Sequence, residues 1–186
     1  MLNLTLVTGG ARSGKSRLAE KITKEIGENI VYIATAIAFD DGMKDRIKKH
    51  RNSRPKEWTT IEKYRGFNTL KNNQDFLDAD TIILDCMTIM ISNLILESGY
   101  DFYKITMEEV DKLEEEIFNE IDSLLKIMED YNKNFVVVTN EVGMGLVPSY
   151  KLGSIFRDIA GRGNQYLAKK ATEVHLTVSG IPLKIK

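Results

Sequence analysis

The sequence predicts an α/β fold in which a mainly parallel sheet is covered by helices on both faces. Short apolar runs rich in valine and isoleucine alternate with longer segments of helical periodicity. The runs are apolar at nearly every position, which is typical of parallel strands that are buried on both faces. The 186 residues suffice for one compact domain with a sizeable core, so we expect residues 1–186 to form a single domain.

Three strong strands are expected in the first half of the chain. Leu4–Val7, Asn29–Ala34 and Asp80–Asp85 are apolar runs rich in β-branched residues, and each should be a buried strand. The segments between them are more polar or helically periodic. Helices are predicted from residue 17, over 43–51 and over 87–96, with a turn over 52–55 and a short edge strand over 60–63.

The second half supplies the longest helix and the remaining strands. Thr106 and Glu109 have the spacing of a capping box, so a helix should begin there and run to about Tyr131. Its apolar residues recur at helical spacing, and we expect its acidic face to be solvated and not to bind a metal. Further elements are predicted as strands over 135–139, 173–178 and 183–185, and as a helix over 152–171.

The composition excludes several classes of protein. Hydrophobic residues make up 42% and charged residues 28% of the chain, as in soluble globular proteins. The net charge of -1 provides no global attraction to nucleic acid or to an anionic membrane. Cys86 is the single cysteine, and no apolar run has the length of about 18 residues that a membrane span needs. With no room for a signal peptide before the first strand, we expect a cytoplasmic protein.

The clearest motif follows the first predicted strand. Gly9, Gly14, Lys15 and Ser16 fit the pattern G-x-x-x-x-G-K-[ST] of a phosphate-binding loop. In such a loop, backbone N–H groups and a helix N-terminus surround phosphate oxygens, the lysine reaches the β- and γ-phosphates, and the serine hydroxyl binds Mg²⁺. A glycine-rich turn that matches by chance is the alternative, but the order of strand, loop and helix favours the phosphate site.

Polar residues stand at the carboxyl ends of the predicted strands. In a parallel sheet these ends share one edge, where ligands bind, so we expect Thr8, Thr35, Asp85 and Thr139 to border one site. Asp85 ends a strand well after the phosphate loop, where a P-loop protein places the acid that holds Mg²⁺. The alternative is an aspartate that caps the next helix, and the upstream loop favours the metal role.

The two histidines have different surroundings. His50 lies in a basic segment that would lower its imidazole pKa and attract phosphates, and a neutral histidine can act as a covalent nucleophile. From these residues alone, a surface histidine on a basic helix is the favoured interpretation. His175 falls in an apolar strand, where a structural role is expected.

Other polar residues leave two interpretations open. The loop over 139–145 contains Gly143 and Gly145, which indicate either a close approach to a ligand or a tight turn. Arg157 and Arg162 are too poorly aligned on one helical face for a convincing phosphate clamp, and ion pairs account for them equally well. By themselves, Arg54 and Glu62 could equally be surface residues.

Taken together, these segments resemble the adenosylcobinamide kinase / adenosylcobinamide-phosphate guanylyltransferase family over essentially the whole chain. The Asn-Glu-Val-Gly-Met-Gly block and the block from His50 to Pro55 are the most specific parts of the resemblance. The matching segments are residues 9–16, 32–35, 46–58, 139–148, 156–165 and 178–186.

The resemblance implies a RecA-like P-loop enzyme that assembles as a homotrimer and has two activities. One would phosphorylate the aminopropanol hydroxyl of adenosylcobinamide, a corrinoid, with ATP or GTP as donor. The other would transfer GMP from GTP, through a GMP–histidine intermediate, to adenosylcobinamide phosphate. The matching position makes His50 the implied nucleophile, whereas Lys15 and Mg²⁺ would neutralise phosphate charge.

The family's nucleotide-binding positions carry over to this sequence, with two departures. Lys49 replaces a second histidine that some members have beside the nucleophile, so His50 would act alone. Asp85 stands where many members have glutamate, so it is expected to contact either the nucleotide or Mg²⁺. The implied nucleotide-binding residues are Gly9, Gly10, Ala11, Arg12, Ser13, Gly14, Lys15, Ser16, Ala34, Thr35, Ala36, Arg51, Asn52, Ser53, Arg54, Glu62 and Asp85, with Ser16 and Asp85 as metal ligands.

Overall fold

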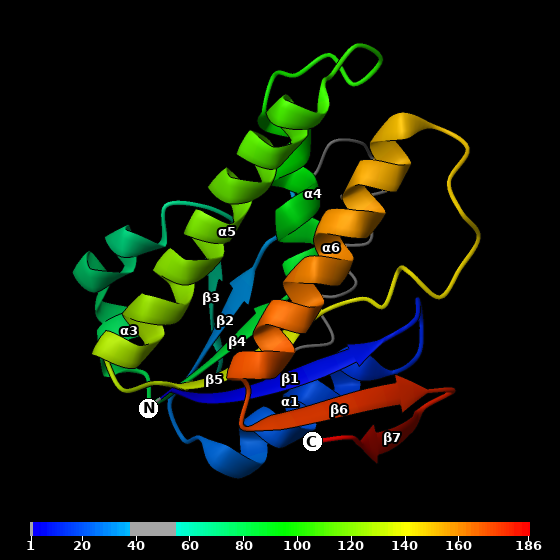
Figure 1. Ribbon diagram of the computed structural model, residues 1–186. Coiled ribbons are helices and arrows are strands. Elements are labelled where there is room, and N and C mark those ends of the chain that lie inside the picture. Colours follow the sequence, from blue (N-terminus) through cyan, green and yellow to red (C-terminus); the bar gives the residue numbers. More distant parts are fainter. Residues whose placement is uncertain (1, 38–54) are drawn as a thin grey trace.

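A seven-stranded sheet forms the centre of the computed structural model, which describes residues 2–37 and 55–186 (Figure 1). The strands are β1 (Asn3–Gly9), β2 (Ile30–Ala34), β3 (Thr59–Glu62), β4 (Thr81–Asp85), β5 (Asn134–Val138), β6 (Glu173–Val178) and β7 (Ile181–Lys184). Their order in the sheet is β3-β2-β4-β5-β1-β6-β7. All neighbouring strands are parallel except β6 and β7. The predicted α/β class with a mainly parallel sheet is confirmed.

The central strands are apolar because both of their faces are covered. Every residue of β2 is buried, as are residues 81–84 of β4 and 135–138 of β5. Parallel strands enclosed in this way need no polar face, which explains the continuous apolar runs. The less apolar β3 and β7 form the two edges, and β7 is exposed throughout.

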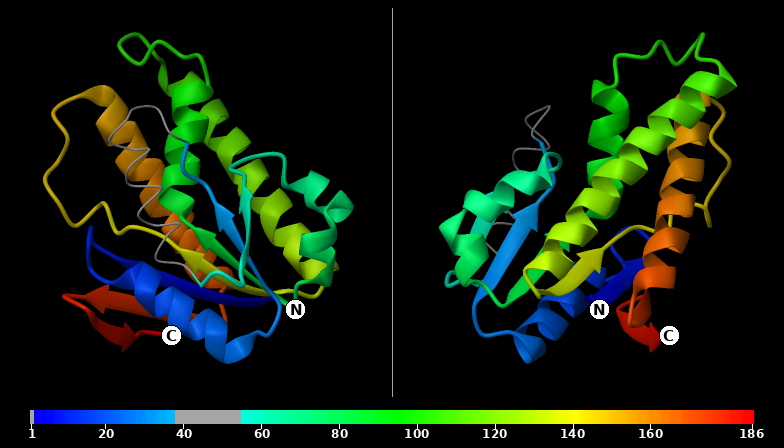
Figure 2. Two further views of the ribbon diagram at one scale, coloured as in Figure 1. Left: turned by 180° about the vertical axis from the view of Figure 1, so that it is seen from behind. Right: turned by 60° about the vertical axis from the view of Figure 1, so that its left-hand side comes forward.

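Helices cover both faces of the sheet, as predicted, but they do so unequally. On one face α1 (Lys15–Ile26) packs against Val7 and Val138 through Ala19. The opposite face carries a larger core and most of the helices (Figure 2). The helices on that face are α3 (Gln74–Asp78), α4 (Met87–Glu97), α5 (Met107–Asp130) and α6 (Lys151–Lys170).

The start of α5 confirms the predicted capping box. The Thr106 hydroxyl accepts a hydrogen bond from the Glu109 N–H, and the Glu109 carboxylate accepts one from the Thr106 N–H. The acidic face of α5 is more than a solvated surface, because several acids bind neighbouring elements. Glu114 pairs with Arg162 of α6, and Glu120 accepts the N–H of Gly66. Among the described residues, no group of acids, histidines or cysteines could hold a metal ion.

Several elements differ from the prediction. A 3₁₀ helix, η1 (Phe67–Asn72), and α3 were not predicted, because each is too short to show a helical period. The last strand was predicted over 183–185, but β7 is Ile181–Lys184 and includes Pro182. An edge strand tolerates proline because the missing N–H has no ladder partner on the open side. The predicted helix over 43–51 lies outside the described residues, as does nearly all of the turn over 52–55.

Within the described residues, no helix is both long enough and apolar enough to cross a membrane.

Candidate active site

The phosphate-binding motif forms a compact loop between β1 and α1, as predicted. Gly14 is the residue before the helix and has a φ of 94°, a conformation that glycine adopts without strain. The Ser13 N–H donates to the Gly10 carbonyl at 3.3 Å, which closes the loop on itself. Lys15 is the first residue of α1, and Ser16 is the second. The N-terminal end of α1 therefore lies directly at the loop, where its dipole favours an anion.

Lys15 is buried although it carries a charge. Its side chain is 8% exposed, and its Nζ donates to the Gly10 carbonyl at 3.0 Å. The ammonium therefore lies within the loop and is not extended into solvent. A buried cation among backbone N–H groups is suited to bind a polyanion, because it is less screened than a surface charge.

Gly9 is required by packing. A Cβ added at this position would lie 2.5 Å from the Thr177 carbonyl oxygen and 2.6 Å from Ser13 Oγ. At Gly10, by contrast, an added Cβ would meet nothing within 4 Å. The two adjacent glycines thus differ in what they contribute to the loop.

We expect Gly9→Ala to destabilise the protein by about 1 to 3 kcal/mol, the usual cost of overpacking, and to weaken nucleotide binding because the loop must shift. Gly10→Ala should change the free energy of unfolding by less than about 0.5 kcal/mol. Urea unfolding and the rise of Tm on adding GTP measure the two effects. Equal losses in both variants would contradict this account of the loop.

The carboxyl ends of the strands form one edge, as expected for a ligand site. In the ladder register, Glu62, Ala34, Asp85, Val138 and Val7 are successive partners across five neighbouring strands. The phosphate loop follows β1 at this edge, with β5 between β1 and β4. The structure therefore places three sets of predicted nucleotide-binding residues at the same edge: the phosphate loop, residues 34–36, and the acids at the ends of β3 and β4.

Asp85 does not cap the following helix. The residue before α4 is Cys86, and no side chain caps that helix. Instead, Asp85 Oδ2 accepts a hydrogen bond from the Tyr32 hydroxyl at 2.8 Å. The capping alternative is therefore wrong, and the carboxylate remains at the candidate site. Together with the Ser16 hydroxyl it offers the oxygen ligands that Mg²⁺ prefers, with phosphates and water completing the coordination.

Thr35 and Cys86 join the ends of β2 and β4. The Thr35 hydroxyl donates to the Cys86 carbonyl at 2.8 Å and accepts the Cys86 N–H at 2.9 Å. Asn93 of α4 donates to the Thr35 carbonyl at 2.7 Å. Burial, and then the nearby Asp85 charge, raise the pKa of the Cys86 thiol to about 12. The thiol therefore stays protonated at neutral pH and is a structural group and not a nucleophile.

A second buried network holds the segment after β5. The Thr139 hydroxyl donates to Asn164 Oδ1 at 2.7 Å and lies 3.1 Å from the Thr88 hydroxyl. Asn164 of α6 also donates to the Asn140 carbonyl at 3.0 Å. Thr88 and Asn164 were not identified from the sequence as site residues. A polar residue on the buried face of a helix is the signal that could have found them, as for Thr88 on apolar α4 and Asn164 on amphipathic α6.

The loop over 139–150 is hydrogen-bonded to the phosphate loop near its start and is exposed in its middle. The Glu141 N–H donates to the Gly9 carbonyl at 3.0 Å, whereas Met144, Leu146 and Val147 are largely exposed. Neither glycine of this loop has a positive φ, and an added Cβ would make only ordinary contacts. The backbone of this loop therefore does not require glycine at either position, and close approach to a ligand stays a prediction.

The remaining sequence candidates lie elsewhere or outside the described residues. Arg157 pairs with Asp158, and Arg162 forms two bonds with Glu114, so neither belongs to a phosphate clamp here. His175 contacts Glu173 at 3.2 Å, which is consistent with a structural role. The predicted residues His50, Arg51, Asn52, Ser53 and Arg54 lie outside the described residues.

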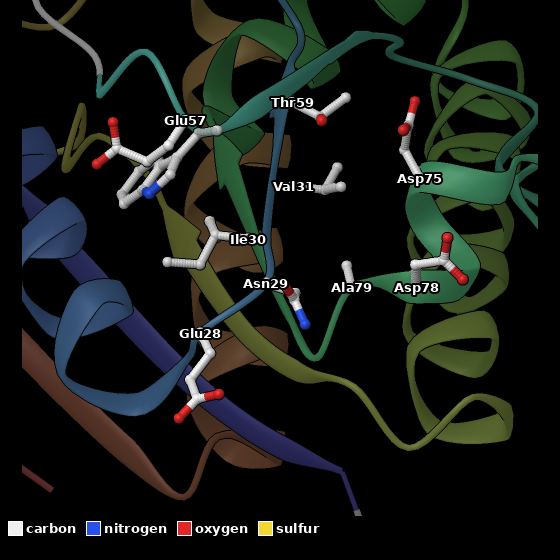
Figure 3. Close-up of a pocket in the computed structure, with 10 residues that line it drawn as sticks. Glu28, Asn29, Ile30, Val31, Glu57, Thr59, Asp75, Asp78 and Ala79 are labelled. Atoms are coloured by element: carbon white, nitrogen blue, oxygen red, sulfur yellow. The ribbon is translucent and has the colours of Figure 1, made fainter.

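Figure 3 shows a cavity of about 290 Å³ with its lining residues. It lies where β2 and β3 begin, at the opposite end of the sheet from the phosphate loop, which follows the end of β1. It is bordered by the segment that begins β2, by α3 and by the start of β3. Four carboxylates line it, those of Glu28, Glu57, Asp75 and Asp78, and none of the described residues that line it is basic. A site for phosphates needs the opposite charge, so this cavity is not part of the candidate active site.

Comparison with known proteins identifies similar chains over nearly the whole length. The family model for cobinamide kinase / cobinamide phosphate guanyltransferase matches residues 5–185. The bifunctional adenosylcobalamin biosynthesis protein CobU of Escherichia coli is 45% identical over 98% of this chain and 99% of its own length. CobU of Salmonella typhimurium is also 45% identical over 98% of this chain and 99% of its own length. CobP of Pseudomonas aeruginosa is 35% identical over 97% of this chain and 96% of its own.

Proposed function

Because this chain belongs to the cobinamide kinase / cobinamide phosphate guanyltransferase family, we propose that it is a bifunctional enzyme of cobalamin assembly. It phosphorylates adenosylcobinamide and then transfers GMP from GTP to adenosylcobinamide phosphate, giving adenosylcobinamide-GDP. We propose that residues 1–186 act as one nucleotide-binding catalytic domain. A cytoplasmic location remains a prediction.

The observation that carries this proposal is the position of Lys15. Its ammonium is buried inside a phosphate loop at the carboxyl edge of a parallel sheet. Phosphoryl transfer needs mainly positioning and stabilisation of charge, and both are supplied by such a loop. The loop N–H groups and Lys15 would hold the triphosphate while the corrinoid hydroxyl attacks its γ-phosphorus. A new O–P bond forms, the bond to the β–γ bridging oxygen breaks, and the nucleoside diphosphate and the hydroxyl proton are released.

The second reaction requires a nucleophile, which we assign to His50. A nitrogen of its imidazole would attack the α-phosphorus of GTP, form a P–N bond and release pyrophosphate. A phosphate oxygen of adenosylcobinamide phosphate would then attack the same phosphorus and free the histidine. Covalent catalysis of this kind divides one difficult displacement into two easier ones.

Further nucleotide contacts are proposed at the shared edge. Glu62 ends β3 and would contact the guanine base or the ribose, together with Ala34–Ala36 and Arg51–Arg54. Asp85 ends β4 and would contact either the nucleotide or Mg²⁺. We keep Mg²⁺ as a cofactor, with Ser16 as a ligand and Asp85 as a further ligand in the second case. When bound, it would neutralise charge on the triphosphate.

We also propose that the enzyme is a homotrimer. The family resemblance suggests this state, and exposed apolar side chains on the edge hairpin give it physical support. Four apolar side chains of this hairpin are at least half exposed: Val178, Ile181, Leu183 and Ile185. Exposed edge strands and apolar patches favour association with another chain. Light scattering of the purified protein measures its mass, and the mass of a monomer would contradict the proposal.

A labelling experiment tests the function. The protein is incubated with GTP labelled at the α-phosphate, and the chain should acquire an acid-labile GMP. Adding adenosylcobinamide phosphate should then remove the label from the chain and produce labelled adenosylcobinamide-GDP. A separate incubation with adenosylcobinamide and GTP or ATP labelled at the γ-phosphate should yield labelled adenosylcobinamide phosphate.

The outcomes separate three functions. A plain P-loop kinase would transfer the γ-phosphate without a GMP adduct. A nucleotide-dependent switch would hydrolyse nucleotide slowly and modify no corrinoid. Either result would exclude the bifunctional enzyme.

A further inference from the structure

The turn between β6 and β7 contacts the phosphate loop directly. Two residues form this turn, Ser179 with a φ of 51° and Gly180 with a φ of 82°. The Gly180 N–H donates to the Ser13 carbonyl at 2.8 Å. Because β6 is the parallel neighbour of β1 in the sheet, the turn after β6 and the loop after β1 lie at the same edge (Figure 1).

Packing also joins the two segments. A Cβ added at Gly14 would lie 3.3 Å from the Gly180 Cα and 3.8 Å from the Thr177 Cγ2. At Gly9, the nearest atom to an added Cβ is the Thr177 carbonyl oxygen. Both glycines of the motif thus lie against β6 or its turn, so the loop rests on the hairpin.

The hydrogen bond from Gly180 to the Ser13 carbonyl also determines the direction of the Gly14 N–H. In a planar trans peptide, the C=O and the following N–H point in opposite directions. Because Gly180 holds the Ser13 carbonyl, the Gly14 N–H points away from the hairpin. The same reasoning applies at the start of the loop, where Glu141 holds the Gly9 carbonyl and thereby directs the Gly10 N–H.

We propose that the Ser179–Gly180 turn is a positioning element for the nucleotide, which fixes the Ser13 carbonyl so that the Gly14 N–H faces the phosphates. This inference rests on the proposed nucleotide-dependent function. A loop whose N–H donors are oriented in advance binds phosphate without the cost of ordering them. The C-terminal hairpin therefore belongs to the nucleotide site although it carries none of the motif.

Gly180→Ala tests the proposal, with Gly99→Ala as a matched control. Both glycines have positive φ, 82° and 77°, and an added Cβ would meet nothing within 4 Å at either position. The backbone strain introduced by alanine should therefore be similar, and so should the loss of Tm. Gly99 lies in the loop between α4 and α5, away from the phosphate loop.

Isothermal titration with GTP and MgCl₂ measures the outcome. We expect Gly180→Ala to raise the Kd of GTP about tenfold, as for one lost hydrogen bond, and Gly99→Ala to leave it unchanged. Equal Kd values in the two variants would overturn the proposal. If the wild-type protein does not bind GTP, the proposed function fails and this inference fails with it.

A second pair of variants tests the proposal if Gly180→Ala does not fold. Asparagine tolerates a positive φ better than alanine, so Gly180→Asn should fold and raise the Kd by about threefold relative to Gly99→Asn. Identical affinities for these two variants would also overturn the positioning role.

Discussion

Replacing His50 with alanine is expected to abolish the GMP adduct on the chain. Without the imidazole no P–N bond can form, so α-labelled GTP should leave no label on the protein. Synthesis of adenosylcobinamide-GDP should fall by at least about 10³-fold, because the covalent route is lost. The kinase reaction should persist within about threefold, since it needs the phosphate loop and not the histidine. Gel autoradiography and chromatography of the corrinoid products measure both activities.

Lys49→Ala is the control for this experiment. Lys49 adjoins His50 in the same basic segment, so its removal tests whether charge alone explains the labelling. We expect Lys49→Ala to retain the adduct. Labelling of His50→Ala at the wild-type level would remove His50 from the mechanism and would direct attention to another nucleophile.

Lys15→Ala should reduce both activities together. Its buried ammonium would neutralise charge on the triphosphate in each reaction, and loss of one such preorganised group typically lowers the rate by about 10²- to 10³-fold. We therefore expect parallel decreases in kcat/KM for phosphoryl transfer and in the rate of GMP labelling. Steady-state assays and a time course of labelling provide the two measurements.

Lys21→Ala is the matched control for Lys15→Ala. Lys21 lies on the same helix, but its side chain is 72% exposed and pairs with Glu25. Its removal should leave both activities unchanged. If Lys15→Ala lost one activity but kept the other, the two reactions would not share one phosphate site.

Most of the fold could be predicted because its central strands are buried on both faces. A short run that is apolar at every position, such as that of β5, is typical of such strands, and the capping box of α5 marks the start of that helix. The elements that were missed, η1 and α3, are too short for periodicity to reveal them. The start of the edge strand β7 was predicted too late in the sequence, because Pro182 suggested a turn. An edge strand accommodates proline, so β7 includes this residue.

The candidate site was predictable where its residues are close in sequence or where they end parallel strands that share one edge. The phosphate-binding motif is contiguous, so its position between a strand and a helix was predicted correctly. The networks behind it join residues from separate strands and helices, as when Asn93 of α4 reaches the Thr35 carbonyl. No local pattern encodes such a pairing. Geometry excludes the capping role of Asp85, because its carboxylate bonds to Tyr32 on a neighbouring strand, whereas its role as a metal ligand stays a prediction.

The position of β1 in the sheet affects when the nucleotide site can form. β1 lies between β5 and β6, and both strands are distant from it in the sequence, as is the turn that holds its loop. The phosphate motif therefore gains its supports only when long-range contacts form, and such contacts form slowly during folding. Nucleotide binding would thus report that these distant segments have folded onto β1.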